Sequence, residues 1–281
     1  MLKTVDFLGR QITRLIAGDN PVNGHTYIPE MVSKDDLLGY HTEEKVLEAM
    51  RESIRCGYNA WMPLGSDFML RAIYHHRMTE AKPLEWIFQS FAPIDFAVNL
   101  RMMADVEPLG IYHRGTDTDG FCEAGQFDIL KDRIKMIKDR GIKAGLGTHV
   151  PETMLRAEYE DWGCDFYVPC LHNSRKRGEA APSAFVTGKP KELVFYNEDR
   201  PLMFAAIQEV KKPCIAFKLY AGGQIFRGLS RDNWPVAAEK AMKETYENIK
   251  ETDIACVGFF QRDSNQLREN AEMAARILAV D

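Results

Sequence analysis

The sequence predicts a single (β/α)8 barrel, and its length, its alternation of elements and its number of strand-like runs all point to that fold. The chain has 281 residues, which suits one domain because such barrels take about 250 residues. Short apolar or β-branched runs alternate with stretches of helical period, as in βα units around a parallel sheet. Eight such units follow one another along the chain. This number predicts a sheet that closes on itself.

The predicted strands are short apolar runs, and the helices between them have recognisable ends. The strands span residues 14–18, 59–63, 86–90, 110–113, 143–148, 165–170, 214–219 and 254–259. Thr42 is placed to cap the helix that follows it, and Gly57 and Gly141 are placed to end helices in the left-handed conformation. The alternation continues over residues 1–281, so we expect one domain.

Charge and cysteine content narrow the classes of function. The formal net charge is −5, so nucleic acid and anionic membranes are not expected partners, and a small-molecule substrate is. The six cysteines form no CxxC pair, which favours buried thiols in a reducing compartment over a zinc knuckle or a disulfide framework. Residues 1–10 lack the apolar core of a signal peptide. We expect a cytoplasmic protein. Its oligomeric state is left open, and a homo-oligomer is one possibility.

The two ends of the chain resemble those of aldo-keto reductases. Leu8-Gly9 precedes a run that ends in Gly18, similar to that family's Leu-Gly hairpin, which plugs the barrel floor before a first strand ending in glycine. Val-Gly-Phe at 257–259, followed by Gln-Leu-Arg-Glu-Asn at 266–270, resembles the family's last βα unit. With the order of elements between them, these segments imply a hairpin that closes the barrel floor.

Most residues that this family needs for NADP-dependent reduction are nevertheless replaced. Where its second strand reads Asp-Thr-Ala-x-x-Tyr-Gly, this chain has Asn59-Ala-Trp-Met-Pro-Leu64-Gly. The third strand ends in Ser90 without the family's lysine, and only the histidine of the fourth strand is kept, as His113. Leu64 cannot protonate a carbonyl oxygen. Hydride transfer is therefore not expected.

The positions that would hold the cofactor are also changed. Thr148-His149 stands where the family has Ser-Asn for the nicotinamide carboxamide, and the sixth strand lacks the usual glutamine. Phe217 could still stack on a nicotinamide, and Arg262 could meet a phosphate. We expect no tight NADP binding, while an NADP-dependent oxidoreductase with a substituted proton donor remains the alternative.

Three histidines lie at the predicted ends of consecutive strands. His113, His149 and His172 follow the fourth, fifth and sixth strands, and neighbouring strands lie about 4.8 Å apart. Imidazole is a common ligand for divalent metal ions. The sequence therefore predicts a three-histidine metal site, with Asp19, Asp117 or Asp119 as a further carboxylate. The alternative is that the histidines contact substrate hydroxyls separately.

Three residues are candidate catalytic groups. Lys218 lies near the end of an otherwise apolar strand, where it could form a Schiff base, donate a proton or pair with a substrate oxyanion. A structural ion pair is the alternative for Lys218. Asp19 and His113, at the ends of the first and fourth strands, complete the predicted set.

Other polar side chains are predicted to bind substrate at the same edge of the barrel. Amide, carboxylate and imidazole groups match the donors and acceptors that sugar hydroxyls require. A turn, or for Arg262 a charge pair with Asp263, is the alternative. The predicted substrate-binding residues are Asn20, His25, Asn173, Gln224 and Arg262.

Two long connections follow the first and sixth strands. Residues 19–40 and 172–199 exceed the usual length of βα loops, and such loops lie at the face of a barrel where substrate binds. The second carries a group of basic residues, which predicts a cationic lid, with a solvated loop as the alternative. This group comprises Arg175, Lys176, Arg177, Lys189 and Lys191.

These features predict an enzyme that acts on a small polyhydroxylated or carbonyl compound, in carbohydrate metabolism or related chemistry. Acid–base catalysis, with or without a divalent metal, would make it a lyase, an isomerase or a hydrolase. Besides the oxidoreductase alternative, a non-catalytic barrel that binds a ligand is also considered. The density of ionisable groups at the predicted strand ends favours an enzyme over such a barrel.

Overall fold

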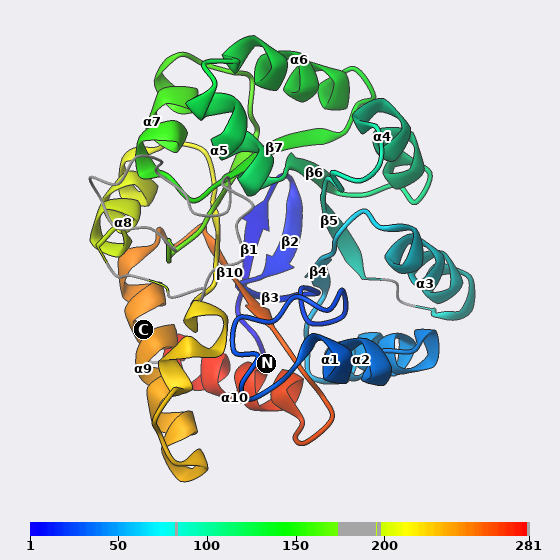
Figure 1. Ribbon diagram of the computed structural model, residues 1–281, viewed down its shortest axis with the longest axis vertical. Helices are drawn as coiled ribbons and strands as arrows, with labels where there is room; N and C mark the ends of the chain where they lie inside the picture. Colours follow the sequence, from blue (N-terminus) through cyan, green and yellow to red (C-terminus); the bar gives the residue numbers. More distant parts are fainter. Residues whose placement is uncertain (82–83, 174–194, 196–197, 280–281) are drawn as a thin grey trace.

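The computed structural model describes residues 1–81, 84–173, 195 and 198–279, and its strands form a barrel (Figure 1). Eight parallel strands pair in the order β8-β7-β6-β5-β4-β3-β10-β9. Parallel bridges from Tyr167 to Cys214 and from Cys170 to Phe217 join β8 to β9. The (β/α)8 barrel is therefore confirmed. Its strands are β3 (Leu15–Gly18), β4 (Ala60–Met62), β5 (Glu85–Gln89), β6 (Gly110–His113), β7 (Lys143–Thr148), β8 (Phe166–Pro169), β9 (Ile215–Phe217) and β10 (Ile254–Gly258).

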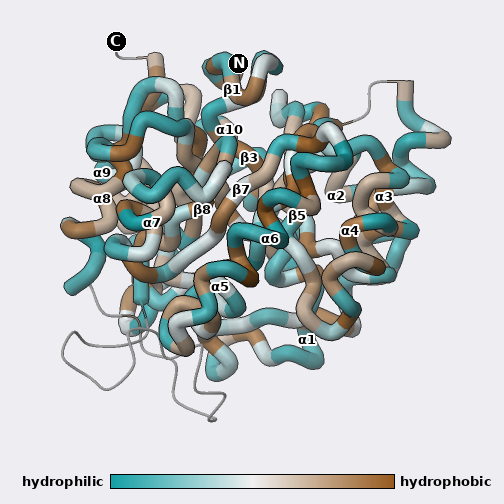
Figure 2. Tube along the Cα trace, turned by 90° about the horizontal axis from the view of Figure 1, so that it is seen from above, coloured by the Kyte–Doolittle hydropathy of each residue, from teal (hydrophilic) through white to brown (hydrophobic). Residues whose placement is uncertain are grey.

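An antiparallel hairpin closes the floor of the barrel, at the amino ends of its strands. Strands β1 (Thr4–Phe7) and β2 (Arg10–Thr13) are joined by Leu8-Gly9, and the positive φ of both residues (57° and 83°) suits a tight two-residue turn. Phe7 meets Phe166 of β8 edge-on, with 5.7 Å between ring centroids. Figure 2 shows β1 at the end of the molecule opposite α1 and α5. The predicted hairpin is confirmed.

Helices surround the strands (Figure 1). Thr42 caps α2 by accepting from the Lys45 amide, and Gly57 follows that helix at φ 91°, as predicted. None of the described helices has the length and apolar character needed to cross a membrane. The helices are α1 (Lys34–Tyr40), α2 (Glu43–Arg55), α3 (Asp67–Thr79), α4 (Phe96–Ala104), α5 (Gly115–Glu123), α6 (Phe127–Lys138), α7 (Pro151–Tyr159), α8 (Arg200–Glu209), α9 (Trp234–Asn248) and α10 (Gln266–Leu278).

Alternation along each strand divides its side chains between the barrel interior and the helical layer. On β6, Tyr112 belongs to the interior cluster with Phe7 and Phe166, whereas Ile111 packs in the outer cluster against the helices. Because successive side chains of a strand point to opposite faces, His113 lies on the same side as Ile111. The register of β6 therefore directs His113 away from the barrel interior.

Candidate active site

His113 faces the helical layer and not the mouth of the barrel, which is formed by the carboxyl ends of the strands. Its ring lies beside Phe96 of α4 and Phe121 of α5. Arg133 lies 2.9 Å from Nε2, and because a guanidinium only donates, Nε2 must accept and Nδ1 carries the proton. Nδ1 meets Thr118 Oγ1 at 2.8 Å. Burial and Arg133 lower the pKa of His113 to about 3. The prediction of a catalytic, metal-binding His113 is corrected: this residue is a neutral link between a strand and its helices.

His172 also has both ring nitrogens engaged. Nε2 accepts from Arg200 at 2.9 Å, so Nδ1 carries the proton and donates to the carbonyl oxygen of Lys218 at 2.8 Å. The described residues contain no group of three His, Cys, Asp or Glu that could hold a metal ion. The prediction that His113, His149 and His172 form a metal site is therefore wrong, because these residues do not form such a group. His172 instead supports the backbone of Lys218.

His149 remains at the mouth, where a carboxylate orients its ring. Asp119 Oδ2 lies 2.7 Å from Nδ1, and Thr148 Oγ1 donates to the other carboxylate oxygen at 2.5 Å. Nε2 is then left for the side chain of Cys170, with which His149 forms a hydrogen bond. Burial opposes protonation of the ring, but Cys170 and Asp119 outweigh it and raise the pKa of His149. Asp119, considered above as a metal ligand, is thus a histidine partner.

Helix α5 brings this carboxylate to the end of β7. Gly115 begins the helix, and a Cβ at that position would lie 3.2 Å from the Thr148 amide nitrogen and 3.3 Å from a His149 ring carbon. Only a residue without a side chain allows so close an approach without displacement. The glycine thus lets α5 place Asp119 against His149.

The residues at the NADP positions of the resembling family make contacts within the protein. Thr148 and His149, at the carboxamide positions, are both hydrogen-bonded to Asp119. Leu64, at the position of the proton donor, is buried and apolar. The expected lack of tight NADP binding therefore stays a prediction.

Cys170 is the functional candidate that the sequence analysis missed. It directly follows β8, is buried, and lies with its sulfur 3.0 Å from the carbonyl oxygen of His172. Burial alone would raise its pKa, but the charges of Lys218 and His149 outweigh this effect and lower it. Of the other cysteines, Cys164, Cys214 and Cys256 are buried as expected and Cys56 and Cys122 are half-buried; desolvation raises the pKa of all five. The position of Cys170 at the end of a predicted strand, next to the strand of His149, is the signal in the sequence that could have identified it.

Lys218 is held at the mouth in an unusual backbone conformation. Its φ is 60°, in the left-handed region that costs a residue with a side chain roughly 1–2 kcal/mol. Its carbonyl oxygen accepts from the His172 ring and from the Ala221 amide. Its ammonium group lies over the rings of Tyr27 and Phe195, 4.7 and 4.8 Å from their centroids. Strain of this kind is typical of functional positions, where the surrounding contacts sustain it.

Asp19 supplies a second ionisable group at the carboxyl end of β3. Oδ2 accepts from the Leu64 amide at 2.9 Å and from Asn23 Nδ2 at 2.7 Å. Burial nevertheless raises the pKa of this carboxyl to about 6. A group that exchanges its proton near neutral pH suits a general acid or base.

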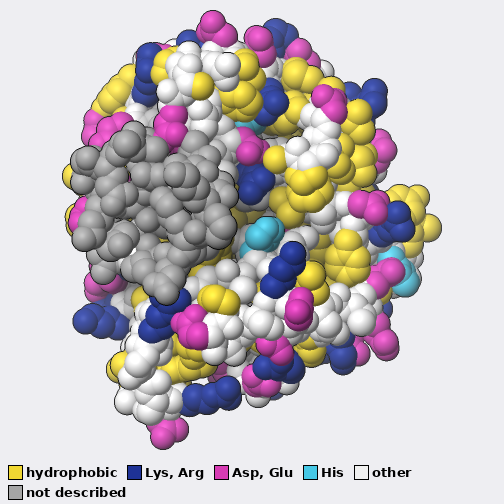
Figure 3. Space-filling model, in the orientation of Figure 1, with side chains coloured by type: hydrophobic (Ala, Val, Ile, Leu, Met, Phe, Trp, Pro, Cys, Tyr) yellow, Lys and Arg dark blue, Asp and Glu magenta, His cyan; other side chains and the backbone are white. Residues whose placement is uncertain are grey.

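The predicted substrate-binding residues of the first loop lie in a turn near the mouth. The backbone oxygen of Asn20 accepts from the amide of His25 at 3.0 Å. Desolvation, followed by the charges of Arg114 and Lys218, lowers the pKa of the His25 ring, although the residue as a whole is exposed. Figure 3 shows a histidine and basic side chains near the centre of one face of the molecule. The role of Asn20 and His25 in binding stays a prediction.

The other three predicted binding residues make contacts within the protein. Asn173 is buried and donates to Asp199 at 3.1 Å. Gln224 accepts from the Phe195 amide at 2.8 Å and donates to the Tyr27 carbonyl at 3.0 Å. Arg262 forms ion pairs with Asp36 and Asp263, at 2.9 and 3.1 Å, which matches the charge-pair alternative. The basic residues of the predicted lid, residues 175–191, lie outside the described residues.

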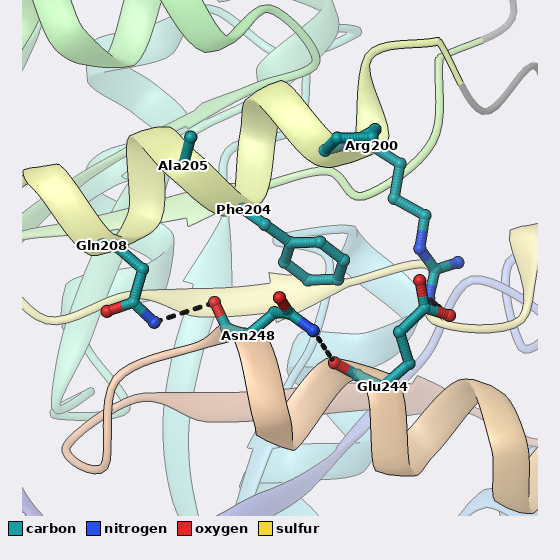
Figure 4. Close-up of a pocket in the computed structure, with 7 residues that line it drawn as sticks. Arg200, Phe204, Ala205, Gln208, Glu244 and Asn248 are labelled. Carbon is teal, nitrogen blue, oxygen red and sulfur yellow. Dashed lines mark hydrogen bonds and ion pairs between the residues drawn. The ribbon is translucent and has the colours of Figure 1, made fainter.

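A groove also lies on the outside of the barrel, between α8 and α9 (Figure 4). Phe204 forms its floor, Gln208 donates to the Asn248 carbonyl at 2.9 Å, and Arg200 pairs with Glu244 at 3.0 Å. The groove lacks the buried acid–base groups of the mouth. We therefore place the candidate active site at the mouth, around Asp119, His149, Cys170 and Lys218.

Asp19 makes a testable prediction about stability. Its pKa of about 6 in the folded protein lies above the ordinary 3.8, so folding favours its protonated form and the wild type loses stability as pH rises through 6. We expect Asp19→Asn to change stability little near pH 3.8 and to gain up to about 3 kcal/mol relative to wild type above pH 6. Urea unfolding between pH 4 and 8 measures this difference.

The exposed Asp232 offers a matched control. Asp232→Asn should show no comparable rise in relative stability with pH. A relative stability of Asp19→Asn that stays constant or falls as pH rises would refute the raised pKa.

No protein-family model matches the chain, and no curated protein sequence matches it. Solved structures with the same fold were found. A truncated 3-deoxy-D-arabino-heptulosonate 7-phosphate synthase from Thermotoga maritima is 10% identical, with a TM-score of 0.59, covering 99% of this chain and 92% of its own. Gox0644 in its apo form is 11% identical, with a TM-score of 0.58, covering 100% and 94%.

A looser match is a probable 2-pyrone-4,6-dicarboxylic acid hydrolase from Acinetobacter baumannii, 10% identical, with a TM-score of 0.48 and coverage of 85% and 82%. These structural neighbours thus include a synthase and a probable hydrolase. At such low identity the similarity shows the barrel fold alone. These matches do not place the chain in the aldo-keto reductase family, so its relation to that family remains a resemblance.

Proposed function

We propose that this chain is an enzyme that acts on a small polar carbonyl compound by acid–base chemistry, with His149 as its main proton-transfer group. One observation carries the proposal: Asp119 holds a buried imidazole at the barrel mouth, beside Lys218. A carboxylate on Nδ1 fixes the tautomer, so that proton exchange with a reacting group falls to Nε2. The mouth is also the face where barrel enzymes bind their substrates.

The neighbouring residues give this imidazole complementary roles. The positive charge of Lys218, which acts on His149 and Cys170, would stabilise negative charge that develops on a substrate carbonyl oxygen. Asp19, with its pKa near 6, can take up or supply a second proton. Lyases, isomerases and hydrolases all use such a combination, so the proposal covers these three classes.

The non-catalytic alternative accounts less well for the same residues. A binding barrel would not require a carboxylate-held histidine, nor a lysine kept in the left-handed conformation. The oxidoreductase alternative lacks a proton donor at Leu64, and its cofactor positions are engaged elsewhere. Acid–base catalysis without hydride transfer therefore has the strongest support.

The test is a panel of sugar acids, lactones, hydroxy-acid esters and ketoses, followed by NMR in D2O without added nicotinamide cofactor. We expect the wild type to convert at least one compound or to exchange its protons with solvent. His149→Ala should abolish this activity, because no other group can then occupy the position of Nε2.

His75→Ala is the matched control, since His75 is an exposed histidine on α3 that pairs with Glu43. It should retain wild-type activity. Conversion that survives in His149→Ala, or that depends on added NADPH, would refute the proposal.

A further inference from the structure

We infer that Cys170 is a covalent nucleophile and that the substrate is an acyl compound, an ester or a lactone of a small polar acid. The inference rests on the proposed function of His149 and selects hydrolysis from the three reaction classes. It follows from the way in which three elements bring a carboxylate, an imidazole and a thiol into one chain of hydrogen bonds.

The order of these groups is that required for activation of a thiol. Asp119 from α5 binds Nδ1 of His149 at 2.7 Å, and His149, directly after β7, hydrogen-bonds with the side chain of Cys170, directly after β8. A base that is oriented by a third group and contacts a nucleophile is the general arrangement of nucleophilic catalysis. Strands β7 and β8 pair with Thr148 opposite Pro169, so His149 and Cys170, which follow these residues, are adjacent.

Two states compete for the proton of Cys170. A neutral thiol can donate to the His172 carbonyl oxygen, 3.0 Å away. Alternatively, the proton moves to His149, which leaves a thiolate beside an imidazolium. The charge of Lys218 favours the thiolate but opposes the imidazolium, the carboxylate of Asp119 favours the imidazolium, and burial opposes both charges. Tyr112 also lies within electrostatic reach of Cys170 but is neutral at ordinary pH, because burial raises its pKa.

The reaction is balanced without any additional oxidant or reductant. The Cys170 sulfur attacks the acyl carbon, the carbonyl π electrons move to oxygen beside Lys218, and the tetrahedral adduct collapses with loss of an alkoxide that takes the proton from His149. Water then attacks the thioester while His149 accepts its proton, and collapse of this second adduct returns that proton to the departing sulfur. The net change is one ester and one water converted to one acid and one alcohol.

The first experiment measures the thiolate directly and does not depend on access to the sulfur. The ultraviolet absorbance of the thiolate is titrated in the full chain for wild type and for Cys170→Ser, and the difference is assigned to Cys170. We expect the midpoint of Cys170 to lie below the pKa of about 8.5 of an ordinary cysteine. In His149→Ala its midpoint should rise above that of the wild type.

The second experiment tests covalent chemistry with p-nitrophenyl acetate. We expect a stoichiometric burst of p-nitrophenolate and an acetyl group on the peptide that contains Cys170. Cys170→Ser should lose both. Cys164→Ser, which alters another buried cysteine near the opposite end of β8, should keep both. Circular dichroism checks that each variant is folded.

The outcomes separate this inference from the proposed function. If the midpoint of Cys170 lies at or above that of an ordinary cysteine, or if the burst persists in Cys170→Ser, the nucleophile is refuted. If Cys170→Ser retains a conversion that His149→Ala loses, the nucleophile is likewise refuted while acid–base catalysis by His149 stands. If both variants retain the conversion, the inference and the proposed function fail together.

Discussion

Asp119→Asn should lower the turnover of any substrate found for the wild type by about 10³- to 10⁴-fold. The carboxylate accepts from Nδ1 of His149 at 2.7 Å and from Thr148 at 2.5 Å. An amide is almost the same size, but it can present a donor to Nδ1 and so stabilise the wrong tautomer of the ring. The loss should appear in kcat at saturating substrate, because the fold and the substrate-binding groups remain.

Asp117→Asn is the control for this prediction. Asp117 lies two residues earlier on α5, is half-buried and faces Arg114 at 3.9 Å. It should retain turnover within a few-fold of the wild type. An Asp119→Asn variant with turnover as high as that of Asp117→Asn would show that the orientation of His149 does not limit the reaction.

Phe166→Ala should lower the free energy of unfolding by about 3–5 kcal/mol. Phe166 is fully buried in the barrel interior and meets Phe7 of the hairpin edge-on. Gly145 on β7 makes room for its ring, since a Cβ there would come within 2.4 Å of it. The cavity left by truncation lies between rigid strands and the hairpin, so it can collapse only in part.

Urea unfolding at pH 7 measures this change. Phe68→Ala on α3 is the control, because Phe68 is 37% exposed and should alter stability by less than about 1 kcal/mol. If Phe166→Ala had an equally small effect, the hairpin would not be packed against β8 as described.

The strands could be predicted well because each is a short apolar run with clear limits in the sequence. Residues 110–113 and 143–148 coincide with β6 and β7, and the other strands differ from their predictions by a few residues at the ends. Ser90, for example, is predicted to end the third strand, whereas β5 ends at Gln89 although the Ser90 amide still donates to Tyr112 of β6. Local sequence does not determine such contacts.

The candidate site could be predicted only in part, and the errors have physical causes. His113 ends β6, but the side of the strand on which a residue lies depends on register, and Tyr112 occupies the interior. By the spacing of the cysteines alone, Cys170 is indistinguishable from the other expected buried thiols. Its lowered pKa depends on Lys218 and His149, which lie far from it in sequence. Arg262, predicted to bind substrate, forms ion pairs with two carboxylates at the surface. His149, by contrast, follows its strand as predicted, and Lys218 directly follows β9, which ends two residues before the end of the predicted strand.

NMR of the His149 imidazole tests the central claim most directly, because it requires no substrate. With ¹⁵N-labelled histidine, the account predicts a hydrogen-bonded Nδ1 proton that disappears in Asp119→Asn. It also predicts a pKa above the ordinary 6.5, since Cys170 and Asp119 stabilise the charged ring despite its burial. A ring that titrates at or below 6.5, with an Nδ1 proton unchanged by Asp119→Asn, would contradict a carboxylate-held acid–base centre at the mouth of this barrel.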